Sequence, residues 1–307
     1  MPALVSTPLK ARINFVKHRS QFQVPVESFL TFDPSRLPPT EELDVPIYDL
    51  RKDIERGLPS ETEQLDDKGF AVVLHETKCD LGEGLETVEG TNAYLEEITE
   101  QVRRMLTERL GASRILVWNS VVRRNNSEVV KEEKEARQLV PEEGKPPAKS
   151  VKAAARQAHV DQDEEYARII CQRAAGDDVF DKYGRVQIIN LWRPLSGPVT
   201  NAPLAVCDFR SLDIDDSTMH FASVYGTGLG ISHNVGQRWH YISHQMADEG
   251  LLLKCFDSWS ADSCPSDRAF YAAHVACDVY GEEPISDPDW VEKARESIEV
   301  RLVVLHE

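Results

Sequence analysis

The spacing of hydrophobic residues changes along the chain, and the change predicts two kinds of structure. Between Thr91 and Leu110 apolar side chains recur every three or four residues, and Gly111 follows them. This is the period of an α-helix, and glycine often ends one, so we predict a helix over 91–110. Further along, short apolar runs separated by turn residues predict strands at 115–118, 186–192, 204–207, 240–243, 250–256 and 297–305.

The order of these elements predicts a fold of the α+β class that is mainly β. Closely spaced strands with turns such as 194–198 are typical of a barrel or sandwich, which preceding helices would buttress. Residues 65–75 resemble a helix end, a glycine stop and a buried strand. We predict a single domain over residues 1–307, with an N-terminal arm (1–60) and helices in 1–114 and the β-core in 115–307.

One long segment, residues 125–150, interrupts the predicted core with charged residues and prolines. It lies just before His159. It is either a solvated loop or a lid that orders over a bound substrate, since long loops beside active sites often do this.

Composition and charge exclude some classes of function. Of the residues, 41% are hydrophobic and 28% charged, as in ordinary globular proteins, and the formal net charge is −17. This acidity argues against a nucleic-acid partner, because phosphates are bound by clustered Lys and Arg. The six cysteines have no CxxC spacing, which favours free buried thiols. No signal peptide or membrane-spanning stretch is apparent, so we expect a soluble, cytoplasmic protein with no membrane partner.

Three residues have the types and order of an iron site. His159 and Asp161 are two apart, so on a strand both side chains face the same way, and His274 would come from a distant strand. Two imidazoles and one carboxylate on one face of an ion leave open positions and favour Fe(II). A second pair, His240 and His244, is a weaker candidate, because it lacks the glutamate of the zinc-protease pattern.

The last predicted strand supplies a cation that could bind the carboxylate of an organic acid. Arg295 and Ser297 share one face of that strand, and arginine binds a carboxylate through two parallel hydrogen bonds. The pair could hold the far carboxylate of a keto dicarboxylic acid whose other end chelates the metal. Arg301 has the same parity along the strand, so it is the alternative cation.

Five sequence blocks carry a resemblance to a known family. They are QAHVDQ at 157–162, GRVQIINLWRPLSGPV at 184–199, PLAVCDFRS at 203–211, RWHYISHQMADEGLLLKCFDS at 238–258 and ARESIEVRLVV at 294–304. Together they resemble the fungal hydroxylase/desaturase family, which is related to cephem 7-methoxylase and the gibberellin desaturase. The resemblance covers residues 115–307 well and the N-terminal third loosely.

The resemblance implies a double-stranded β-helix (jelly-roll or cupin-like) core and an Fe(II)- and 2-oxoglutarate-dependent oxygenase that uses O2. It implies His159, Asp161 and His274 as ligands and Arg295 with Ser297 as the 2-oxoglutarate site. Residues of the shared blocks would line or buttress the pocket: Asn190, Trp192, Arg193, Arg238 and Tyr241. Of these residues, Arg193 and Arg238 could equally form structural ion pairs with Asp208 or Asp257. Three departures leave the substrate and the outcome of the reaction open: His240 in place of a tyrosine, His274-Val275-Ala276-Cys277 in place of His-Thr-Ala-Phe, and a longer, more acidic segment at 278–294.

The predicted function is therefore hydroxylation, desaturation or cyclisation of a small secondary metabolite. A 2-oxoglutarate-independent iron oxygenase of the same fold is the main alternative, and a non-catalytic β-barrel binding protein is the other. The expected partner is a small-molecule substrate, and a homodimer is left open.

Overall fold

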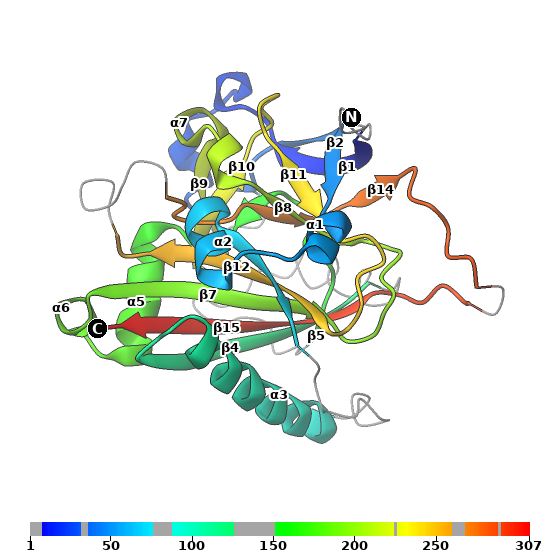
Figure 1. Ribbon diagram of the computed structural model, residues 1–307. Coiled ribbons are helices and arrows are strands. Elements are labelled where there is room, and N and C mark those ends of the chain that lie inside the picture. The colour runs from blue at the N-terminus through cyan, green and yellow to red at the C-terminus, as the bar shows by residue number, and fades with distance from the viewer. Residues whose placement is uncertain are drawn as a thin grey trace, which may run out of the picture.

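Two β-sheets form the centre of the protein in the computed structural model (Figure 1). The structure describes residues 8–31, 36–75, 88–125, 151–223, 226–259, 268–287 and 290–307. The charged segment 125–150, predicted as a loop or lid, therefore lies almost wholly outside the described residues. The mainly β fold predicted from the sequence is confirmed.

The larger sheet has nine strands and the smaller has six. The larger runs in the order β14 (Asp278–Tyr280), β1 (Leu9–Val16), β2 (Thr40–Asp49), β11 (Trp239–Tyr241), β8 (Leu204–Cys207), β13 (His274–Ala276), β6 (His159–Val160), β10 (Gly226–Ile231) and β9 (Thr218–Ser223). The smaller runs β3 (Phe70–Leu74), β12 (Glu249–Asp257), β7 (Arg185–Pro194), β15 (Glu296–His306), β4 (Arg114–Arg124) and β5 (Val151–Lys152).

The helices pack around these sheets. They are α1 (Arg51–Arg56), α2 (Glu61–Lys68), α3 (Val88–Arg109), α5 (Glu164–Ala175), α6 (Val179–Lys182) and α7 (Ile214–Ser217), with short 3-10 turns η1 (Arg19–Gln21), η2 (Val26–Phe29) and η5 (Phe209–Ser211). The helix predicted over 91–110 is α3, which lies along the outer face of the smaller sheet (Figure 1). Its apolar side packs Ile98, Val102 and Leu106 against strand residues such as Val300 and Leu302.

The predicted N-terminal arm is wrong, because residues 9–49 supply two full strands of the larger sheet. Strand β1 pairs with β2 over eight residues, and β2 continues the sheet by pairing with β11. Alternate residues of β1, namely Ala11, Ile13 and Phe15, are fully buried. This period of two is the pattern of a strand with one face in the core.

The predicted order of helices first and strands afterwards is also incomplete. Helix α5 follows the first candidate ligand and lies inside the region predicted as strands alone. Asp163 caps it by accepting a hydrogen bond from the backbone of Tyr166, and it ends at Gly176. Its buried residues Ala167, Ile170 and Cys171 pack against the inner face of the smaller sheet.

A buried cluster of charges joins α2 to the smaller sheet. Lys254 is fully buried, and its Nζ lies 3.0 Å from Asp66, 2.9 Å from Asp257 and 2.9 Å from the carbonyl oxygen of Ala269. Arg185 pairs with both aspartates at 2.5 Å. The Ala269 contacts fix the segment that leads into β13, so the cluster supports the strand that carries His274.

Replacing Asp66 with asparagine should destabilise the fold by about 3–5 kcal/mol, the usual effect of leaving a buried charge unpaired. Burial opposes ionisation of Asp66, but Arg185 and Lys254 outweigh it and lower its pKa. A lowered folded pKa means that the stabilisation is present above about pH 4, the unfolded pKa, and is lost as pH falls. Urea unfolding at pH 7 and below pH 4 measures both effects.

The matched control is Asp178→Asn, which removes an exposed pair with Lys182. This change should alter the free energy of unfolding by less than about 1 kcal/mol. Equal losses in the two variants, or an Asp66→Asn loss that does not shrink in acid, would contradict the assignment.

Candidate active site

The pairing of β6 with β13 brings the two predicted histidine ligands together. His274 lies directly opposite His159 in this antiparallel pair, and residues opposite each other point to the same face. Their ring centroids are 4.4 Å apart. Asp161 follows just after β6 ends at Val160, so it reaches the site from a bend rather than from the strand itself.

Backbone carbonyls fix the orientation of both imidazoles. The Nδ1 atom of His159 donates to Gln157 at 2.7 Å, and Nδ1 of His274 donates to Ala272 at 3.0 Å. A carbonyl can only accept, so in the neutral rings each Nε2 is left unprotonated. Both Nε2 atoms face Asp161 Oδ1, at 3.4 Å from His159 and 3.9 Å from His274. Burial lowers the pKa of His274 to about 4, which keeps the ring neutral and able to bind a metal.

The second oxygen of Asp161 is held from the smaller sheet. Asn190 Nδ2 donates to Oδ2 at 2.7 Å, and the Arg301 guanidinium lies 3.5 Å from the same atom. Burial opposes ionisation of Asp161, but Arg301 and the histidines outweigh it and hold its pKa well below the usual range. The carboxylate is therefore ionised and oriented, with Oδ1 directed at the histidines.

Arg295 is a buried cation with no carboxylate partner among the described residues. Its residue exposure is 4%, and one guanidinium nitrogen donates to the carbonyl of Ala202. Its Nε and the hydroxyl of Ser297 are both buried without a hydrogen-bond partner. Burial, with a smaller effect of Arg123, lowers the pKa of Arg295 to about 9. An unpaired buried charge of this kind is costly, so the position is built for an anion.

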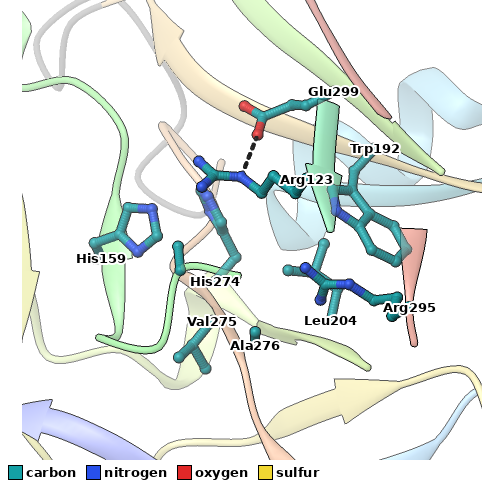
Figure 2. A pocket seen from close by; sticks show the side chains of 10 residues that line it. Arg123, His159, Trp192, Leu204, His274, Val275, Ala276, Arg295 and Glu299 are labelled. Carbon is teal, nitrogen blue, oxygen red and sulfur yellow. Dashed lines mark ion pairs between the residues drawn. The ribbon is translucent and has the colours of Figure 1, made fainter. Parts of the chain in front are cut away.

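One pocket connects this cation to the histidines. Its wall includes His159, His274, Trp192, Arg123, Glu299 and Arg295. Figure 2 shows the histidines on one side of it and Arg295, below the Trp192 ring, on the other. The histidines and Arg295 therefore line one and the same pocket.

The donor set fits a divalent metal and a dicarboxylate. His159, Asp161 and His274 offer ligand atoms that all lie within 4.8 Å of one another. Two nitrogens and one oxygen are the donors of the facial triad of non-haem iron. The partnerless Arg295 Nε and Ser297 hydroxyl would be satisfied by a carboxylate.

Known proteins match the chain over nearly its full length. A family model described as Oxidoreductase/YMDC permease-like domain matches residues 13–305. Hydroxylase/desaturase efuI of Hormonema carpetanum is 30% identical over 266 residues, which is 79% of each chain. The chain belongs to the hydroxylase/desaturase family. Aspirochlorine biosynthesis protein N of Aspergillus oryzae is 37% identical over 131 residues, 40% of this chain and 50% of its own length. The match thus spans only half the length of that relative.

The fold of the chain is that of a known oxygenase structure. The iron and alpha-ketoglutarate-dependent endoperoxidase NvfI superposes with a TM-score of 0.70 at 21% identity, covering 98% of both chains. In sequence, nvfI of Aspergillus novofumigatus is 30% identical over 156 residues, 49% of this chain. The predicted family, fold class and oxidoreductase class are confirmed. The described part of the chain contains no helix that is long and apolar enough to cross a membrane.

Three residues predicted to lie at the cosubstrate do not line the pocket. Arg301 pairs with Asp161 and with Glu299, at 2.9 Å from the latter, so its charge is already neutralised. The Tyr241 hydroxyl donates to Glu282 at 3.2 Å, and its ring packs with Val275 in a separate core cluster. Asn190, the third such residue, holds Asp161 instead of lining the pocket.

The structure also places the other predicted site residues of the chain. Trp192 lines the pocket, whereas Arg238 pairs with Asp208 at 3.3 Å, which was the structural alternative. Arg193 donates to the carbonyl of Ala247.

The alternative metal pair is not assembled, because His244 faces Glu282 and the ring of His240 packs between Tyr48 and Phe70. Of the predicted free thiols, the described Cys171, Cys207, Cys255 and Cys277 are unpaired and buried.

Sequence reasoning missed two charged residues of the pocket, Arg123 and Glu299. Glu299 lies between Ser297 and Arg301 on β15 and has the same inward parity. That parity could have identified it. Arg123 lies beyond the end of the strand predicted at 115–118, and β4 extends to Arg124. Only its pairing opposite Ser297 places it in the pocket.

Proposed function

We propose that this protein is an Fe(II)- and 2-oxoglutarate-dependent oxygenase that hydroxylates, desaturates or cyclises a small secondary metabolite. The observation that carries the proposal is that the buried Arg295, which has no carboxylate partner among the described residues, lies in the same pocket as the two histidines. His159, Asp161 and His274 would hold the iron. Arg295 and Ser297 would hold the far carboxylate of 2-oxoglutarate. Membership of the hydroxylase/desaturase family supports the same reaction class.

The residues of the chain would bind, orient and exclude water. When bound, Fe(II) and 2-oxoglutarate supply oxygen activation with release of succinate and CO2. His159 and His274 present fixed Nε2 atoms because their Nδ1 protons are held by carbonyls. Trp192 and Leu204 form an apolar wall on the Arg295 side of the pocket. Because this wall excludes water, it would strengthen the ion pair between Arg295 and a bound carboxylate. Substrate placement relative to the iron would decide which of the three outcomes follows.

We propose further that residues 1–307 act as one oxygenase domain with a small-molecule substrate. The nine-stranded and six-stranded sheets support a single unit, because N-terminal strands complete both of them. A cytoplasmic location, the absence of nucleic-acid and membrane partners, and a homodimer are still predictions from the sequence.

Succinate release tests the proposal without knowledge of the substrate. Aerobic incubation with Fe(II) and 2-oxoglutarate should give slow, uncoupled succinate formation that stops when iron, oxygen or 2-oxoglutarate is omitted. A 2-oxoglutarate-independent enzyme would bind Fe(II) yet form no succinate. A binding protein of the same fold would do neither. Either result would replace the proposal by the corresponding alternative.

A further inference from the structure

Arg123 is a second cation in the pocket, and nothing in the proposed function yet uses it. It extends from β4, directly opposite Ser297 of β15, and its side chain is 14% exposed. Figure 2 shows its side chain at the top of the pocket, with the guanidinium on the side of the histidines. It lines the same pocket as His274 and Arg295, so its charge lies near both ends of that pocket.

The present partners of Arg123 neutralise it only weakly. Its ion pair with Glu299 spans 3.9 Å, which is too long for a hydrogen bond, and one nitrogen donates to the carbonyl of Ala153 at 2.9 Å. Glu299 is held more closely by Arg301 and Asn190, each at 2.9 Å. Loss of Arg123 as a partner would therefore leave Glu299 with two better contacts.

The charges of the described residues around the pocket do not balance. Three arginines with little exposed side-chain surface, Arg123, Arg295 and Arg301, stand against two carboxylates, Asp161 and Glu299. Arg301 is shared between the two acids, so the positive excess lies with Arg123 and Arg295. Two like charges in one enclosed pocket repel each other until an anion is placed between them. A dianion with a carboxylate at each end would satisfy both.

We infer that Arg123 binds the keto acid end of the cosubstrate, while Arg295 binds its far carboxylate. This inference rests on the proposed function. Because Arg123 and His274 line the same pocket, Arg123 would contact the carboxylate nearest the histidines and exchange its long pair with Glu299 for that contact. The pocket would then select keto acids at both ends: Arg123 for the keto acid group, and Arg295 for the second carboxylate.

Two ligands separate the roles of the two arginines. 2-Oxoglutarate has both carboxylates, whereas pyruvate has the same keto acid end and no far carboxylate. Dissociation constants are measured anaerobically on the Fe(II) protein from the visible absorption of the keto acid complex. Arg123→Gln should weaken both ligands by the same factor, roughly 10- to 100-fold, the usual effect of losing a charged hydrogen bond. Arg295→Gln should weaken 2-oxoglutarate alone.

The neighbouring Arg124 offers a matched control. It has the same side chain on the same strand and pairs with Glu296 outside the pocket, at 30% exposure. Arg124→Gln should leave both dissociation constants within about twofold, inside the spread of a surface ion pair. Arg123→Lys keeps the charge and should recover most of the binding, which a merely structural role of the guanidinium would not predict.

The outcomes separate this inference from the proposed function. If Arg123→Gln behaves like Arg124→Gln, or weakens 2-oxoglutarate but not pyruvate, the inference about Arg123 is overturned while the proposed function stands. If the unmodified protein binds no 2-oxoglutarate in the presence of Fe(II), the proposed function itself fails.

Discussion

Replacing His274 with alanine should abolish Fe(II) binding and, with it, succinate formation. The fixed Nε2 of His274 is one of three ligand atoms, and the remaining two cannot define a face of the ion. Loss of an outer partner of a metal ligand typically weakens binding roughly 10- to 100-fold, so loss of a ligand itself should exceed that. Isothermal titration calorimetry with Fe(II) under anaerobic conditions measures the loss of iron binding.

His240→Ala is a matched control for His274→Ala, because the two histidines have similar surroundings. It lies in the same row of the larger sheet, since both histidines are paired opposite Val206 of β8. Burial also lowers its pKa to about 4, and its Nε2 has no hydrogen-bond partner. His240→Ala should nevertheless retain Fe(II) binding. If His240→Ala loses iron and His274→Ala keeps it, the ligand assignment is wrong.

The second large effect should come from Arg295→Met. This variant should bind 2-oxoglutarate more weakly, but its ligand-free form should be no less stable. Affinity for 2-oxoglutarate should fall roughly 10- to 100-fold or more, because a charged hydrogen-bonding partner of its carboxylate is lost. Stability of the ligand-free protein should stay the same or rise, because the variant removes a buried charge that no described carboxylate neutralises. Binding of 2-oxoglutarate to the Fe(II) protein and thermal unfolding without ligand measure the two effects.

Arg301→Met serves as the comparison, since Arg301 was the alternative cosubstrate cation. Its charge pairs with Asp161 and Glu299, so its removal takes away the nearest cation of both carboxylates and should lower stability by about 3–5 kcal/mol. A stabilised Arg301→Met together with a destabilised Arg295→Met would reverse the two roles.

Much of the candidate site could be predicted from two features of the sequence. Residues two apart on a strand face the same side, and the site residues follow one another in a recognisable order along the chain. His159 and Asp161 are two residues apart, and Arg295 and Ser297 repeat that spacing at the start of the last strand. The choice between Arg295 and Arg301 could not be made in this way, because both face inward. It depends on which arginine meets a carboxylate across the sheets, and only the fold places Asp161 beside Arg301.

The errors in the predicted fold have physical causes. The period of two in β1 is visible in the sequence, but its interpretation as an arm ignored that Ala11, Ile13 and Phe15 need a core to bury them. Helix α5 has a clear start at Asp163 and a stop at Gly176, yet its apolar runs resemble those of neighbouring strands. The Lys254 cluster joins residues far apart in the chain, which no local pattern reports.

The central claim is that one pocket holds both Fe(II) and 2-oxoglutarate. Anaerobic addition of Fe(II) and then 2-oxoglutarate, followed by visible absorption, tests it most directly. We expect one iron per chain, an absorption band that appears only when both are present, and loss of that band in Arg295→Met at the same 2-oxoglutarate concentration. Iron binding without the band, or a band unchanged in Arg295→Met, would contradict the claim.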